Sequence, residues 1–193
     1  MNTIVTTLKT EAVFSDDGVK RYLLRKTWDN KKPKLSIIML APSGASGIEL
    51  DTTTLLVLNN TDRLGFGSVD ILNLFATLND FSLTSAEEED EENLNIIIES
   101  AKNADVIVYA PGVGKAKNKA FIKRQELVLR ELKQFEDRLN CLSGQSGGGR
   151  LQHPLSPSVR KWVLSRFNID ELCCITETNQ KKKNKNNSKH RED

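Results

Sequence analysis

The fold of this 193-residue chain is decided by the stretch Leu35-Ser36-Ile37-Ile38-Met39-Leu40. Five of its six residues are apolar, which is typical of a strand that is covered on both faces of a sheet. The same pattern continues, with strands predicted at 68–75, 105–110 and 138–142 and helices at 50–64, 93–103, 118–137 and 158–167. This alternation predicts an α/β fold, a three-layer αβα sandwich with a mainly parallel central sheet.

A β-hairpin is predicted ahead of this sheet. The runs from Thr10 to Phe14 and from Arg21 to Trp28 flank Asp17-Gly18, a dipeptide typical of hairpin turns. The length suits one domain with a full core. We therefore expect a single α/β domain over residues 1–175, with the hairpin at about 10–28, and a disordered basic tail over 176–193.

The net charge of +2 is unevenly distributed. Residues 181–193 hold six basic and two acidic side chains, or +4, so the rest of the chain carries −2 (+2 minus +4). That balance argues against broad neutralisation of a phosphate backbone. No signal peptide and no membrane-length apolar run is visible, and the three cysteines lack metal-ligand spacing. We expect a cytoplasmic protein with no membrane partner, no metal and no cofactor.

Polar or glycine-bearing loops follow the predicted strands. They comprise residues 41–47, 73–76, 111–114 and 147–158. In parallel sheets ligands bind beyond the carboxyl ends of the strands, so we expect these four loops to form a site together.

His153 lies in the last of these loops, and the chain's other histidine, His190, lies in the basic tail. An imidazole there suits a general acid, a donor to a developing negative charge, or a ligand of a base edge. The alternative is a histidine that is hydrogen-bonded to the backbone of a structural turn.

Two more polar side chains accompany His153. Ser43 follows Pro42 and is expected to contact a ligand, together with the backbone amides of residues 44–47, or to cap a helix. Asn73 interrupts an apolar strand, which is unfavourable unless its amide is paired. Because an amide both donates and accepts, Asn73 suits reading a nucleobase edge, and pairing with a neighbouring loop is the equal alternative.

Several short motifs occur in a fixed order over about residues 11–165. Among them are Arg21-Tyr22-Leu23-Leu24-Arg25, Ile38-Met39-Leu40-Ala41-Pro42-Ser43, Asn73-Leu74-Phe75-Ala76 and His153-Pro154-Leu155. In this order they resemble the domain-of-unknown-function 1643 (DUF1643) family of bacteria and their phages. That resemblance implies no established activity.

The four loops also resemble, more distantly, those of the uracil-DNA glycosylase superfamily. Proteins of that superfamily have a His-Pro-Ser-Pro-Leu-Ser loop late in the sequence. The resemblance implies that Pro42 and Ser43 lie in the first motif, that Asn73 reads the base, and that His153 stabilises charge on the leaving base. Such enzymes extrude a base into a pocket. The chain departs from them at Ala41, where an Asp or Asn would position water, and Asp51 is the alternative water-positioning group.

Two functional hypotheses follow. In the first, the protein binds a nucleobase, a nucleotide or a nucleic-acid base, with or without glycosylase-like hydrolysis of an N-glycosidic bond. In the second, it is a non-catalytic binding or interaction protein, phage-encoded or acting in host–phage conflict. The oligomeric state stays open. The predicted catalytic residues are His153 and Asp51, and the predicted ligand-binding residues are Pro42, Ser43, Gly44, Asn73, Phe75, Gly112 and Ser156.

Overall fold

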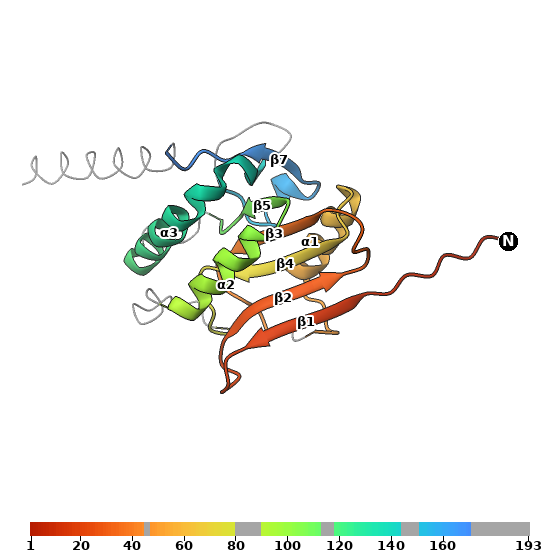
Figure 1. Ribbon diagram of the computed structural model, residues 1–193, viewed down its shortest axis with the longest axis horizontal. Helices are drawn as coiled ribbons and strands as arrows, with labels where there is room; N and C mark the ends of the chain where they lie inside the picture. The colour runs from red at the N-terminus through yellow and green to blue at the C-terminus, as the bar shows by residue number, and fades with distance from the viewer. Residues whose placement is uncertain (45–46, 80–89, 113–117, 144–150, 171–193) are drawn as a thin grey trace, which may run out of the picture.

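A seven-stranded mixed sheet forms the centre of the protein (Figure 1). The computed structural model describes residues 1–44, 47–79, 90–112, 118–143 and 151–170, so the predicted tail and the glycine run at 147–149 lie outside it. The strand order is β1-β2-β4-β3-β5-β6-β7. The strands are β1 (Lys9–Phe14), β2 (Arg21–Thr27), β3 (Lys34–Met39), β4 (Ser68–Asn73), β5 (Val106–Tyr109), β6 (Leu139–Ser143) and β7 (Val163–Arg166).

The parallel part of the sheet is confined to its four central strands. β3 pairs in parallel with β4 and β5, and β5 pairs in parallel with β6. The other three pairings, β1 with β2, β2 with β4 and β6 with β7, are antiparallel. The prediction of a mainly parallel sheet is therefore wrong for the sheet as a whole, because the N-terminal hairpin joins one edge and β7 forms the other.

Helices lie on both faces of this sheet. α2 (Glu91–Lys102) and α3 (Lys119–Leu132) cover one face, and α1 (Thr52–Arg63) covers the other (Figure 1). Each face has its own buried apolar cluster, one including Ile97 of α2 and Val128 of α3, the other including Val57 of α1. The chain thus has an α/β fold. No helix in the described ranges has the length and apolar character that crossing a membrane requires.

Side-chain caps mark where the three helices begin. Asp51 accepts a hydrogen bond from the Thr54 amide at the start of α1, and Asp90 and Asn118 cap α2 and α3 in the same way. These bonds satisfy backbone N–H groups that have no partner within the helix.

The predicted helix at 158–167 is wrong. The segment forms a short 3₁₀ turn, η3 (Pro157–Val159), followed by β7, whose Leu164 lies opposite Leu142 of β6. Pairing with the sheet satisfies the backbone of β7, and this long-range contact overrides the local helical pattern.

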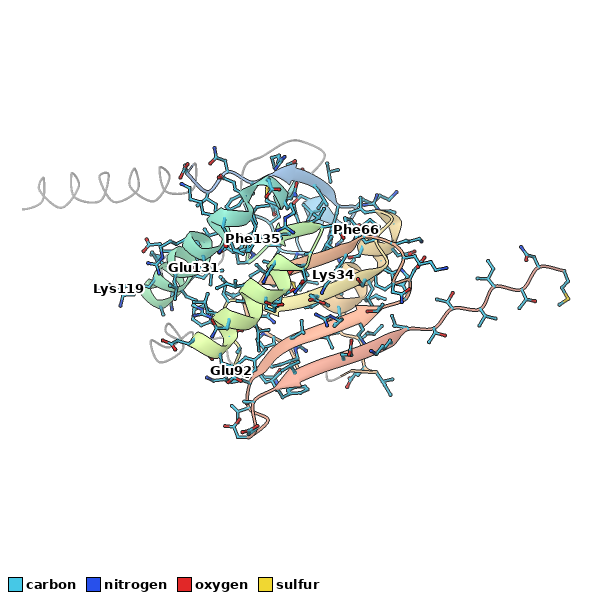
Figure 2. The ribbon with its side chains drawn as sticks, in the orientation of Figure 1. Lys34, Phe66, Glu92, Lys119, Glu131 and Phe135 are labelled. Atoms are coloured by element: carbon cyan, nitrogen blue, oxygen red, sulfur yellow. The ribbon has the colours of Figure 1, made fainter. Side chains whose placement is uncertain are left out.

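The predicted helix at 118–137 is too long at its C-terminal end. α3 ends at Leu132 and continues as the 3₁₀ segment η2 (Lys133–Arg138). Phe135 (Figure 2) leaves helical geometry there, with φ −117° and ψ 20°. It still packs against the cluster under α2 and α3, so the apolar ring is partly buried although the helix stops.

A buried carboxylate joins the hairpin to the parallel sheet. Asp70 of β4 is fully buried and accepts hydrogen bonds from Arg25 Nε and Nη2 at 2.6 and 2.8 Å and from Ser100 Oγ at 2.7 Å. Lys34 Nζ (Figure 2) lies 2.8 Å from the same carboxylate. Burial alone would raise the pKa of Asp70, but the bonds from Arg25, Lys34 and Ser100 lower it, so the group is ionised.

Replacing this carboxylate tests how strongly it holds the sheet together. We expect Asp70→Asn to lower the free energy of unfolding by roughly 2–3 kcal/mol, since two cations lose their partner but still reach solvent. Denaturant unfolding measures this loss. The matched control is Asp16→Asn at an exposed turn position, which should change stability little. Equal effects of the two substitutions would contradict the role assigned to Asp70.

Candidate functional site

The carboxyl ends of β3 and β5 form a topological switch point in the sheet. From β3 the chain passes through α1 to β4 on one side, and from β5 it passes through α3 to β6 on the other. α1 and α3 lie on opposite faces (Figure 1). Ligands of open α/β sheets bind at such points, because the two diverging loops leave room between them. We use the term switch point for this part of the sheet edge.

Two buried cations of β2 hold the loop that follows β3. Arg21 donates from Nη1 to the Ser43 carbonyl oxygen at 3.3 Å, and its side chain is buried. Lys26, also buried, donates from Nζ to Thr10 Oγ1 at 2.8 Å and to the carbonyl oxygen of Gly47. The hairpin therefore anchors both described ends of this loop.

Asp51 stands between Ser43 and the start of α1. One carboxylate oxygen accepts the Thr54 amide at 2.6 Å, and the other accepts the Ser43 hydroxyl. Burial alone would raise the pKa of Asp51, but the bonds from Ser43 and Thr54, with the positive charge of Arg21, lower it. The N-terminus of α1, where an external anion would otherwise bind, is thus occupied by the protein's own carboxylate.

His153 is held in a tight turn with a defined tautomer. The Ser156 amide donates to the His153 carbonyl oxygen at 2.8 Å, and the His153 amide donates to Ser156 Oγ at 3.3 Å. The Leu155 amide donates to His153 Nδ1 at 3.2 Å, which requires a neutral ring protonated on Nε2. Burial lowers the pKa of His153 and the charge of Asp51 partly offsets this, so Nε2–H is a neutral donor.

Gly112 supports His153 from the loop that follows β5. Its φ of +79° lies in the region that favours glycine, and a Cβ atom there would be 3.1 Å from His153 Cβ. The close approach therefore brings the last loop onto the switch point, where the charge of Asp51 acts on the imidazole.

The side chain of Asn73, at the end of β4, is buried and makes no hydrogen bond within the described part of the chain. It is 1% exposed, and neither Nδ2 nor Oδ1 of its amide has a partner there. Its backbone is well held: the Asn73 carbonyl oxygen accepts Asn93 Nδ2 at 3.1 Å, and the next carbonyl accepts Arg124 Nε at 2.8 Å. Among the residues that the structure describes, no neighbouring loop pairs with the Asn73 amide, and the group is unsatisfied there.

The remaining predicted residues occupy different environments. Phe75 is buried in the cluster under α2 and α3, whereas alternation along β4 directs Asn73 to the α1 face. Pro42 is buried and accepts the Asn79 amide at 3.3 Å, while Gly44 is exposed beside the Asn79 side chain. Phe75 therefore belongs to the core, away from the face of Asn73.

Arg21 is the residue of this region that the sequence did not single out. It is 2% exposed, it contacts the loop after β3, and its charge acts on Asp51. Burial lowers its pKa and the charge of Asp51 opposes this, but a guanidinium stays protonated. The available signal was a single cation at the head of an otherwise apolar run, Tyr22-Leu23-Leu24.

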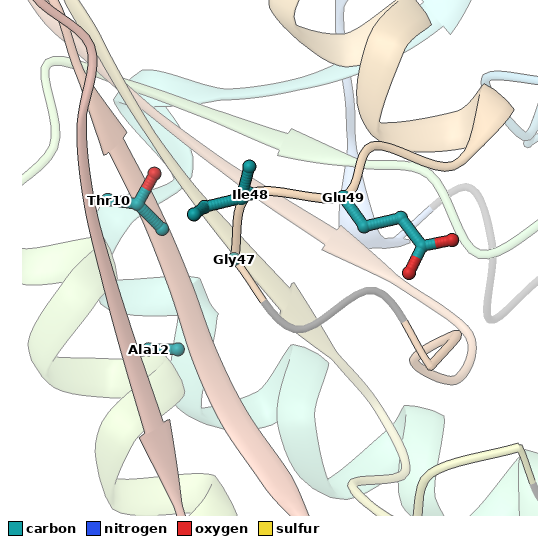
Figure 3. A pocket seen from close by; sticks show the side chains of 5 residues that line it. All are labelled: Thr10, Ala12, Gly47, Ile48 and Glu49. Carbon is teal, nitrogen blue, oxygen red and sulfur yellow. The ribbon is translucent and has the colours of Figure 1, made fainter.

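An open hollow of about 660 Å³ lies elsewhere, beside β1 (Figure 3). Thr10 and Ile48 face each other across it in the figure. Neither His153 nor Asn73 lines it, but Gly47 does, so the hollow adjoins the far end of the predicted loop at 41–47. Its lining residues are Thr10, Ala12, Gly47, Ile48 and Glu49.

In the part of the chain that the structure describes, no group of three or more His, Cys, Asp or Glu side chains could hold a metal ion.

A family model described as "Protein of unknown function (DUF1643)" matches residues 21–155. The chain belongs to this family. The DUF1643 match begins at Arg21 and includes Ser43, Asp51, Asn73, Gly112 and His153, and it ends one residue before Ser156. β1 and β7 lie outside it. No curated protein and no solved structure shows a significant match to the chain.

The contact between Gly112 and His153 is open to a direct test. Gly112→Ala adds both a strained positive φ and a close contact, whereas Gly18→Ala adds only the strain, because Gly18 has φ +70° and open space around it. We expect Gly18→Ala to lose about 1 kcal/mol and Gly112→Ala to lose about 1 kcal/mol more, with shifted imidazole resonances of His153. Denaturant unfolding and NMR measure both. Equal losses with unshifted resonances would contradict the contact.

Proposed function

We propose that the switch point of this DUF1643 protein binds a nucleobase, as a free base or nucleoside or as part of a nucleotide or nucleic acid. Asn73 pairs with the edge of the heterocycle, and His153 Nε2–H donates to one of its carbonyl oxygens. Ser43, Asp51 and Arg21 form the polar wall that faces them. The fold supports this placement, since the loops after β3 and β5 diverge at this edge.

The unsatisfied amide of Asn73 is the observation that carries the proposal. A buried amide without partners is unfavourable, so a native position that retains one requires an explanation. A nucleobase edge offers an adjacent donor and acceptor, which match the two amide atoms. Because the Asn73 side chain is only 1% exposed, a ligand must displace the groups that cover this side chain before it can reach the amide. A trapped water would also satisfy the amide, and binding measurements separate the two explanations.

The charges of the switch point favour an uncharged heterocycle over a phosphate. Arg21 contributes one positive charge, Asp51 one negative charge, and His153 none. A phosphate close to the ionised Asp51 would be repelled, and the helix N-terminus that could hold it is already occupied. We therefore place the base at the switch point and any phosphate outside it.

Substitution of Asn73 separates a functional amide from a structural one. Asn73→Leu removes an unpaired amide, so we expect unfolding free energy to stay equal or to rise by about 1 kcal/mol. The control is Asn60→Leu, because the Asn60 side chain is also buried but forms hydrogen bonds with Leu56, Arg160 and Trp162. Asn60→Leu should lose about 2 kcal/mol of stability.

The same pair of variants is then compared in ligand binding. Calorimetric titration with the common nucleosides should show binding by the wild type, weakened about 10–100-fold in Asn73→Leu. Asn60→Leu should keep the affinity while it remains folded. A wild type that binds none of these nucleosides at millimolar concentration, or an Asn73→Leu protein that loses as much stability as Asn60→Leu, would contradict the proposal.

Hydrolysis of an N-glycosidic bond is a second candidate, favoured by the neutral donor at His153. In that reaction the bond between the base and the sugar carbon breaks, and the bonding electron pair leaves with the base. Water adds to the sugar carbon, and its proton passes to the departing base or to solvent. His153 Nε2–H would stabilise the negative charge that develops on the base. Against it, Ala41 brings no polar group and both Asp51 oxygens already accept bonds.

Base release from uracil-containing and alkylated DNA tests this candidate. If the protein is a hydrolase, the wild type should release base, and His153→Ala should be about 10²–10³-fold slower with unchanged folding. Wild-type protein that binds nucleosides but releases no base would leave binding without turnover as the function.

A further inference from the structure

β1 is an edge strand of the sheet, with β2 as its neighbour on one side. Residues 1–8 precede it and extend away from the body of the protein (Figure 1). Ile4 and Val5 are 85% and 87% exposed in this segment, and Leu8, Val13 and Phe14 are partly exposed. An extended edge with exposed apolar side chains is a template for pairing with another strand.

We propose that β1 pairs antiparallel with β1 of a second copy of this chain, giving a two-fold dimer with one continuous sheet. Such an interface uses the same strand of each copy, so it closes after two molecules. The opposite edge is less suited, because β7 has only four residues. This inference is independent of the proposed function at the switch point.

The charges of β1 select one register. In a dimer whose two-fold axis is normal to the sheet, the residue of β1 through which the axis passes lies opposite the same residue of the other copy. An axis at Lys9 or at Glu11 would place like charges directly opposite each other, which is unfavourable. An axis at Thr10 places Lys9 of each copy opposite Glu11 of the other. Within one chain Lys9 Nζ and Glu11 Oε1 are already 3.1 Å apart, so the dimer would assemble four alternating charges on one face.

The same register explains the hollow beside β1. With Thr10 on the axis, Leu8 of one copy lies opposite Ala12 of the other. Both side chains lie on the face of the sheet where Thr10 and Ala12 line the hollow. Ile48, fully exposed in the single chain, forms the facing wall (Figure 3). The apolar side chain of the partner's Leu8 therefore covers a hollow that the single chain leaves open.

Charge reversal provides the test, on the full chain by sedimentation equilibrium. The wild type should dimerise, and both Lys9→Glu and Glu11→Lys should weaken the dimer at least about tenfold, since each places like charges opposite each other twice. The double variant Lys9→Glu/Glu11→Lys should restore dimerisation. An equimolar mixture of the two single variants should form heterodimers, because its cross-strand pairs are again opposite in charge.

Lys161→Glu is the matched control, since it makes the same change of charge at an exposed position remote in sequence from β1. It should leave the dimer unaffected. Lys9 and Glu11 are exposed, so circular dichroism should show that their variants keep the wild-type fold. A wild type that stays monomeric at about 100 μM, a dimer insensitive to both reversals, or a mixture of the single variants that stays monomeric would each overturn the proposal.

Discussion

The buried carboxylate of Asp70 is the interaction on which the arrangement of the site depends. It binds Arg25 of β2, Lys34 of β3 and Ser100 of α2, so one side chain joins the hairpin, the parallel sheet and a covering helix. Arg25 lies directly opposite Asp70 in the β2–β4 register. This register places Arg21, four residues earlier, at the carboxyl ends of the parallel strands, where it reaches Ser43 and acts on Asp51.

The switch point combines well-satisfied and unsatisfied polar groups. Ser43 and Asp51 are hydrogen-bonded to each other, and the His153 turn is held by its own hydrogen bonds, so their positions are fixed before any ligand arrives. Asn73 differs, because its backbone is anchored while its amide is left without partners. A buried polar group without a partner lowers stability, and such groups are expected at functional positions rather than in the rest of a core.

The sequence predicted the elements that depend on local patterns. The apolar run of β3 and the Asp17-Gly18 hairpin each follow from neighbouring residues, and each is present. The errors arose where distant segments decide the structure. The helix predicted at 158–167 is wrong because the pairing of β7 with β6 cannot be read from its own residues, and the hairpin's place in the sheet depends on the pairing of β2 with the distant β4.

The sequence predicts the site only in part, again because contacts between distant segments decide how its side chains are placed. Strand ends can be found from sequence, and they indicated Ser43, Asn73, Gly112 and His153. Whether the Asn73 amide is paired, and whether Phe75 points toward it or into the core, depends on which face each residue occupies at the end of β4. The sequence does not predict Arg21 as a site residue, because a charged residue in a strand is normally solvated, whereas Arg21 is buried beside Asp51.

The side-chain amide signal of Asn73 offers the most direct measurement of the central claim. It can be assigned in a ¹⁵N-labelled sample by its disappearance on substitution and followed while a nucleoside is added. Our account predicts a saturable shift of this signal, with the His153 ring responding at the same ligand concentration and the Asn60 amide staying still. An Asn73 signal that does not move while the nucleoside perturbs other parts of the protein would contradict it.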